Sequence, residues 1–118
     1  NYLPDALYED WTGPERERLL SLFLRAADKL TGLLVEGGQY DEALDVCARM
    51  LSYDPCWERA YRWMMVAYAH QGDRTLALRA YQRCRATMSA ELGMEPDPAT
   101  TTLYNRILQS EDLSVTVL

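Results

Sequence analysis

The 118-residue sequence predicts an all-α fold in which about five helices pack as antiparallel pairs in a small right-handed array. Apolar residues recur at spacings of three and four, which is the pattern of helices with one buried face. The surroundings of Gly38 return at Gly72, with Ala43 and Ala77 in register, which gives a period of about 34 residues. A repeat of this length describes one pair of helices, and such pairs bury their apolar faces by stacking.

Composition and charge limit the classes of function that we expect. The net charge is −6 and the isoelectric point is near 4.7, so the surface repels phosphate groups and we expect no direct binding of nucleic acid by this segment. No apolar run approaches the roughly 20 residues that span a bilayer, and no cationic leader precedes an apolar stretch. We therefore expect a cytoplasmic protein without membrane contact.

The cysteines and the single histidine do not form a pattern that binds a metal. Cys47, Cys56 and Cys84 are odd in number, and none belongs to a C-x-x-C pair. A structural zinc site needs four close ligands, so we expect neither metal nor cofactor. Reduced thiols are expected instead, with Cys47 and Cys84 as small core residues.

The order of helices follows from their start and stop signals. Residues 1–12 are expected to form a short packed arm or one helical turn, anchored by Trp11. The next helix opens at Thr12, with Pro14 in its first turn, and stops at Gly37-Gly38. Further helices are expected at roughly 40–53, 55–71, 73–92 and 98–110, followed by a coil tail.

Local residues justify these boundaries. Asp54 is expected to cap the third helix, with Pro55 at its first position. Asp73 is expected to cap the fourth, and Gly93 to end it.

Part of the chain resembles the tetratricopeptide family. The positions of that family are held here by Gly38, Tyr40, Ala43, Leu44, Cys47, Met50 and Asp54-Pro55. Two units, roughly 22–89, are covered. The second unit departs from the pattern at Met65, where the family has glycine, and at Ser89, where no proline closes the unit. The fourth helix is therefore expected to run past the standard repeat.

A narrower resemblance covers roughly residues 1–110. The motifs that carry this resemblance lie before and after the helix pairs. They are Leu3-Pro4-Asp5, Asp10-Trp11, Glu15-Arg16-Glu17-Arg18-Leu19 and Leu92-Gly93-Met94-Glu95-Pro96-Asp97-Pro98. This is similar to the bacterial transcriptional activator domain of actinobacterial antibiotic-pathway regulators. The resemblance implies a domain at 1–112 with a tail at 113–118, and a DNA-binding domain outside this segment. It also implies protein partners, namely a second copy of the chain or RNA polymerase components.

The groove face of the third helix offers candidate contact residues. Projection of the first helix of each pair onto the concave side selects Arg59, Arg62, Trp63, Val66 and His70. Arginine beside an indole suits an acidic or aromatic partner group. The alternative is that Trp63 packs under the last helix and the arginines are solvated. A secondary patch at Arg79 and Arg83 is either a partner surface or a solvated helix face.

No catalytic constellation is evident. His70 is the only histidine, and neither a phosphate-binding loop nor a dinucleotide fingerprint is present, so we expect no enzyme. We expect a regulatory protein-interaction domain of a bacterial transcription regulator. Two alternatives stay open: a generic peptide-binding scaffold, and a sensor that holds a small effector among Tyr61, Trp63, Tyr68 and the arginines.

Overall fold

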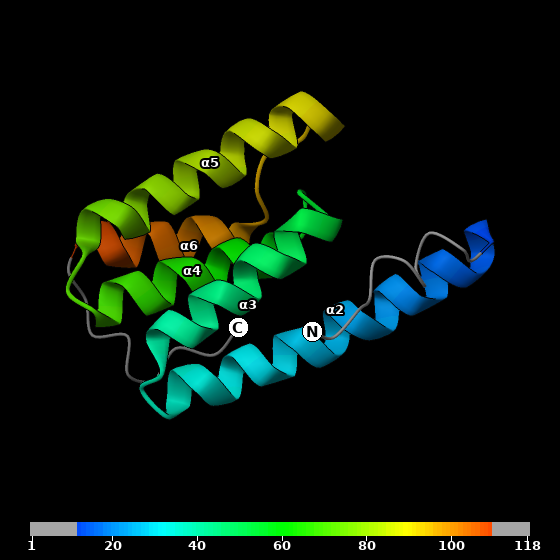
Figure 1. The fold of residues 1–118 in the computed structure, drawn as a ribbon. Helices are drawn as coiled ribbons and strands as arrows, with labels where there is room; N and C mark the ends of the chain where they lie inside the picture. Colours follow the sequence, from blue (N-terminus) through cyan, green and yellow to red (C-terminus); the bar gives the residue numbers. More distant parts are fainter. Residues whose placement is uncertain (1–11, 110–118) are drawn as a thin grey trace.

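The computed structural model describes residues 12–109, and five helices make up that range (Figure 1). They are α2 (Gly13–Glu36), α3 (Tyr40–Tyr53), α4 (Glu58–His70), α5 (Arg74–Leu92) and α6 (Pro98–Leu108). No strand occurs between residues 12 and 109. The predicted all-α fold of tetratricopeptide-like helix pairs is therefore confirmed.

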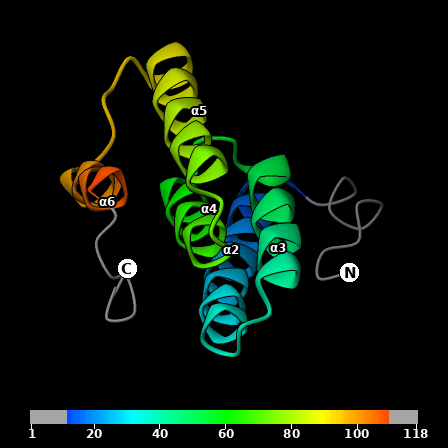
Figure 2. The same ribbon diagram turned by 90° about the vertical axis from the view of Figure 1, so that its left-hand side faces the viewer.

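The helices pack in the order expected of a stacked repeat. Helix α2 contacts α3 and α4, while α4 also contacts α3, α5 and α6. Helix α6 lies against α5, but the described parts of α3 and α5 do not approach each other. The first helix of each pair thus forms one layer (α2, α4, α6), and the second helices α3 and α5 form another (Figure 2).

The two turns inside the helix pairs have the same geometry. Gly38 has φ = 73° and Gly72 has φ = 79°, a left-handed conformation that glycine adopts without steric cost. The amide of Gln39 donates to the Leu34 carbonyl at 2.8 Å, and the amide of Asp73 donates to the Tyr68 carbonyl at 2.9 Å. Donor and acceptor are both displaced by one full period, so the repeat seen in the sequence is a repeat of backbone structure.

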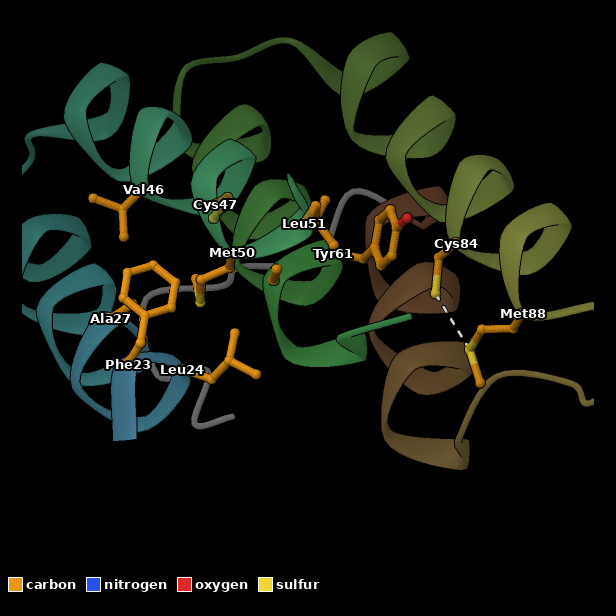
Figure 3. Packing of buried hydrophobic residues seen from close by; sticks show 11 residues of the cluster. Phe23, Leu24, Ala27, Val46, Cys47, Met50, Leu51, Tyr61, Cys84 and Met88 are labelled. Carbon is orange, nitrogen blue, oxygen red and sulfur yellow. Dashed lines mark hydrogen bonds between the residues drawn. The ribbon is translucent and has the colours of Figure 1, made fainter. Parts of the chain in front are cut away.

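Two clusters of buried side chains form the core. The first joins α2, α3 and α4 with the distal half of α5, and Figure 3 shows Phe23, Met50 and Tyr61 within it. The second joins α4, α5 and α6 around Met65, Tyr81 and Leu103. Ala43 and Ala77 are both fully buried, as their matching positions in the repeat predicted. Small residues there let the paired helices approach closely.

Most predicted helix boundaries are confirmed. The Thr12 amide donates to the Glu15 carboxylate at 3.3 Å at the start of α2. The Asp73 carboxylate accepts from the Leu76 amide at 3.0 Å, which caps α5 as expected. Helix α5 continues to Leu92 and ends at Gly93, whose φ is 62°, so the predicted overrun beyond Ser89 is also confirmed.

The predicted start of the third helix is wrong. Helix α4 begins at Glu58, and Trp57 rather than Asp54 precedes its first residue. Asp54 instead closes a turn, because its carboxylate accepts from the Cys56 amide at 3.0 Å and its carbonyl from the Trp57 amide at 3.0 Å. The Tyr61 hydroxyl donates to the Pro55 carbonyl at 2.8 Å and holds this turn against α4.

The remaining differences lie near the ends of the chain. Helix α6 ends at Leu108, slightly before the predicted boundary at 110. The expected arm anchored by Trp11 and the coil tail at 113–118 lie outside the described residues. The domain limits at 1–112 therefore stay a prediction.

Candidate interaction surface

Asp28 on α2 binds two of the predicted contact residues of α4. The Arg59 guanidinium donates through Nε to Asp28 Oδ1 at 2.9 Å and through Nη2 to Oδ2 at 3.0 Å. The Trp63 indole Nε1 donates to the same Oδ1 at 2.7 Å. The Asp28 side chain is 19% exposed and connects α2 to α4. We call these hydrogen bonds the α2–α4 link, and we call the layer α2, α4, α6 the inner helices.

The indole of Trp63 packs against α2, so the alternative that it packs under the last helix is wrong. A Cβ atom at Gly32 would lie 3.3 Å from two carbons of the indole. The absence of a side chain at Gly32 therefore lets the ring lie close to the helix. Trp63 also belongs to the cluster around α2 and α3, whereas the buried residues of α6 belong to the other cluster.

Arg62 lies in a second polar connection, between α4 and α6, named the α4–α6 link. Its Nη1 donates to the Thr100 hydroxyl at 2.8 Å and lies 3.7 Å from Glu58 Oε2. The same Glu58 oxygen accepts from the Asp97 amide at 2.7 Å and from the Thr100 hydroxyl. The Arg62 residue is 9% exposed, so the alternative that it is solvated is wrong.

The other predicted residues of this face differ in exposure. Val66 is 3% exposed and packs in the core cluster that joins α4, α5 and α6. His70 is exposed at the end of α4, and its ring stacks on Tyr40 with centroids 5.5 Å apart. Arg59 keeps 33% of its side chain exposed. A partner could therefore touch Arg59, Trp63 and His70, whereas Arg62 and Val66 would support the face from beneath.

The secondary patch lies on the outward side of α5. Arg79 and Arg83 are both exposed. The Arg83 guanidinium lies 5.6 Å from the centroid of the Tyr61 ring, which is a cation–π distance. Its partner role stays a prediction.

A groove between α2 and α3 is not among the predicted sites. It has a volume of about 310 Å³, with Leu30, Leu34 and Val46 as its apolar part. Glu42, Asp45 and Arg49 form its polar edge. Acidic residues are common at the start of a helix because they interact favourably with the helix dipole. Their presence in the sequence therefore does not predict a groove. Their spacing with Val46 along one side of α3 is the signal in the sequence that could have indicated it.

The thiols are placed as the sequence predicted. Cys47 and Cys84 are fully buried, and burial raises the pKa of each thiol to about 12. Cys56 is partly exposed, and its pKa is also raised, first by desolvation and then by Asp54. Within residues 12–109, no group of three or more histidine, cysteine and acidic side chains could hold a metal ion. None of the described helices combines the length and the apolar character that crossing a bilayer requires.

Sequence comparison assigns a family to this arrangement. The model of the bacterial transcriptional activator domain matches residues 2–108. The chain belongs to this family.

Two groups of curated relatives share the match. The transcriptional regulatory protein MoaR1 of Mycobacterium tuberculosis is 30% identical over 121 residues, which covers 92% of this chain and 39% of that protein. The regulatory protein AfsR of Streptomyces griseus is 30% identical over 98 residues, which covers 83% of this chain and 10% of that protein. The matched region is thus one part of longer regulators, and a regulatory role for this bacterial transcriptional activator domain follows.

Proposed function

We propose that this chain is the protein-interaction domain of a cytoplasmic bacterial transcription regulator. It acts through association with a second copy, through contacts with the transcription machinery, or through both, without catalysis. The residues that read DNA lie outside these 118 residues. Membership of the activator-domain family supports the regulatory part of this proposal, and the net charge of −6 supports the separation from DNA binding.

The observation that carries the proposal is the way the inner helices are fixed to one another. The α2–α4 link uses partly buried charged groups and the α4–α6 link uses largely buried ones, and both connect successive helices of the layer α2, α4, α6. Such connections resist rearrangement of the array, because opening either one leaves a charge without its partner. The array therefore presents its outer side chains at fixed positions, which favours specific protein contacts.

The direct test uses the full-length parent regulator. We would compare it with a version that lacks residues 12–109, measuring promoter binding and transcription by purified RNA polymerase. We expect promoter binding to persist while activation is lost. Full activation by the shortened regulator would contradict the proposed function, and loss of promoter binding at low salt would contradict the separation of DNA reading from this domain.

The groove face of α4 stays our proposed contact surface for the transcription machinery, with Arg59, Trp63 and His70 accessible. His70→Ala is the mildest probe, because His70 is exposed and its ring contact with Tyr40 is a surface stack. We expect reduced activation in the parent regulator with an unchanged melting temperature. Arg79→Ala is the matched control on α5. A larger loss for Arg79→Ala would move the contact to the secondary patch.

A further inference from the structure

Helix α2 carries a mixed basic and apolar stripe on the side opposite the core. Leu22 is 48% exposed and Leu33 is 66% exposed, although both are large apolar side chains. Their separation along α2 is close to three helical turns, so they share one face. Three exposed basic residues lie on the same face. The stripe consists of Arg18, Leu22, Arg25, Lys29 and Leu33.

The charge of this α2 stripe is opposite to that of the whole protein. Arg18, Arg25 and Lys29 are exposed and positive, whereas the chain has a net charge of −6. The acidic residues of the same face, Glu15 and Glu36, lie at its two ends. The stripe therefore suits a surface that is both acidic and apolar.

A surface of that kind lies where α5 ends. Leu92 is 53% exposed and Met94 is 56% exposed, on either side of Gly93, whose φ of 62° turns the chain. Glu91 and Glu95 are exposed beside them. Glu95 lies 3.4 Å from Arg85, but both side chains are more than half exposed, so that pair is weak. Glu91, Leu92, Met94 and Glu95 are named the α5 corner.

The two surfaces cannot meet within one molecule. Among the described residues α2 and α5 make no contact, and the two helices lie on opposite sides of the array with α3 and α4 between them (Figure 1). Together they hold four of the five large apolar side chains that are exposed in residues 12–109. Clustered exposure of this kind, with charges of opposite sign, is typical of surfaces that are covered in an assembly.

We infer that the α2 stripe of one copy binds the α5 corner of a second copy of this chain. The inference rests on the proposed function, since it names the two surfaces through which self-association occurs. Leu22 and Leu33 would be covered by Leu92 and Met94, while Arg25 and Lys29 would face Glu91 and Glu95. Because the two surfaces differ, each copy keeps one surface available for the next, so the contact generates a ring or an open chain.

The test is a charge exchange in the purified 118-residue chain. One variant carries Arg25→Glu with Lys29→Glu, and the other carries Glu91→Lys with Glu95→Lys. Each variant alone places like charges across the contact, so we expect self-association to weaken by about tenfold or more. In an equimolar mixture every contact between unlike copies joins opposite charges, so association should return. Sedimentation velocity over a range of concentrations, at low and high salt, measures this.

The control is Thr102→Glu with Asn105→Glu on α6, because both residues are exposed, lie outside both surfaces and outside the secondary patch, and together add two negative charges. It should leave self-association unchanged, and circular dichroism should show that all variants are folded. A wild-type chain that stays monomeric at every concentration would overturn the inference. So would variants that associate like the wild type, or a mixture that fails to recover. Activation of transcription by the parent regulator is measured separately. If the parent regulator activates transcription while self-association is absent, the inference is wrong but the proposed function through contacts with the transcription machinery is retained.

Discussion

The two helix pairs begin alike and end differently. In the first pair α3 stops at Tyr53, because Asp54-Pro55 forms a turn. The positions one repeat later, Met88 and Ser89, lie inside α5, which continues to Leu92. The repeat thus determines where the turn inside each pair lies and which helix faces are buried. The length of the second helix of each pair is determined by whether a helix-breaking turn such as Asp54-Pro55 follows it. The extra length is what places Leu92 and Met94 at an exposed corner.

The connections to the next inner helix differ as well. Asp28 and Arg62 are one period apart, so they hold the same place in successive repeats, and each binds the inner helix that follows. Asp28 pairs with an arginine whose side chain is 33% exposed. Arg62 and Glu58 have side chains only 11% and 16% exposed. The α4–α6 link is therefore expected to contribute more to stability than the α2–α4 link.

The largest expected effect is at the buried link. Glu58→Ala removes the acceptor for Arg62, for the Thr100 hydroxyl and for the Asp97 amide. Breaking a buried pair in this way costs about 3–5 kcal/mol, and the free energy of unfolding from urea titration measures it. Glu58→Gln keeps an acceptor and should lose less. Equal stability of the alanine variant and the wild type would show that α6 is not held by this link.

A matched pair of substitutions tests the interiors of the two repeats. Ala43→Leu and Ala77→Leu both add volume where helices of one pair touch, since both alanines are fully buried. Overpacking of this kind costs ~1–3 kcal/mol, and the two costs should be similar. Thermal unfolding followed by circular dichroism gives both values. An unchanged melting temperature for either variant would count against the helix register.

A smaller effect is expected at the exposed link. Asp28→Asn removes the charge that Arg59 and Trp63 share, and hydrogen bonds to charged groups contribute about 1.5–3 kcal/mol when solvent is excluded. Partial exposure reduces this contribution, so the loss should be below that of Glu58→Ala. The same urea titration compares them. A greater loss at Asp28 would reverse the ranking of the two links.

The last effect concerns pH, and it develops only in alkaline solution, where the thiols of the unfolded chain begin to titrate. The buried thiols of Cys47 and Cys84 have a pKa of about 12, against 9.0 for a solvent-exposed thiol. Between these values the unfolded chain loses protons that the folded chain retains, so this stabilisation is complete below pH 9 and is lost as the pH rises towards 12. Unfolding midpoints measured across this range should fall less steeply in Cys84→Ala. Identical slopes would contradict the assignment.

Thiol labelling compares the same residues directly. Cys56 should react first with a thiol reagent in the native state, because Cys47 and Cys84 are fully buried. Labelling of Cys84 as fast as Cys56 would indicate that the end of α5 opens readily.

The sequence was sufficient for the features that repeat. Gly38 with Gly72 located both turns, and Ala43 with Ala77 located two fully buried positions. It was insufficient where one side chain type suits two different local structures. Asp54 has the character of a helix cap and instead closes a turn.

The candidate site is harder to predict for the same reason. Helical projection places Arg62 on the groove face, but projection carries no information about the partner that buries it. Thr100 is distant in the sequence, and only the folded position of α6 makes it an acceptor. Helical spacing separates Leu22 and Leu33 of the α2 stripe from the buried Leu24, but spacing alone does not indicate which surface would cover them.

The hydrogen bond from the Trp63 indole to Asp28 has an optical consequence. Because the ring lies between α2 and α4 and its Nε1 is 2.7 Å from a carboxylate, its fluorescence depends on the separation of these two helices. With Trp11 and Trp57 replaced by phenylalanine, Trp63 becomes a single emitter at the contact between the first two repeats. The fluorescence of Trp63 would therefore report whether the binding of a partner changes the separation of α2 and α4.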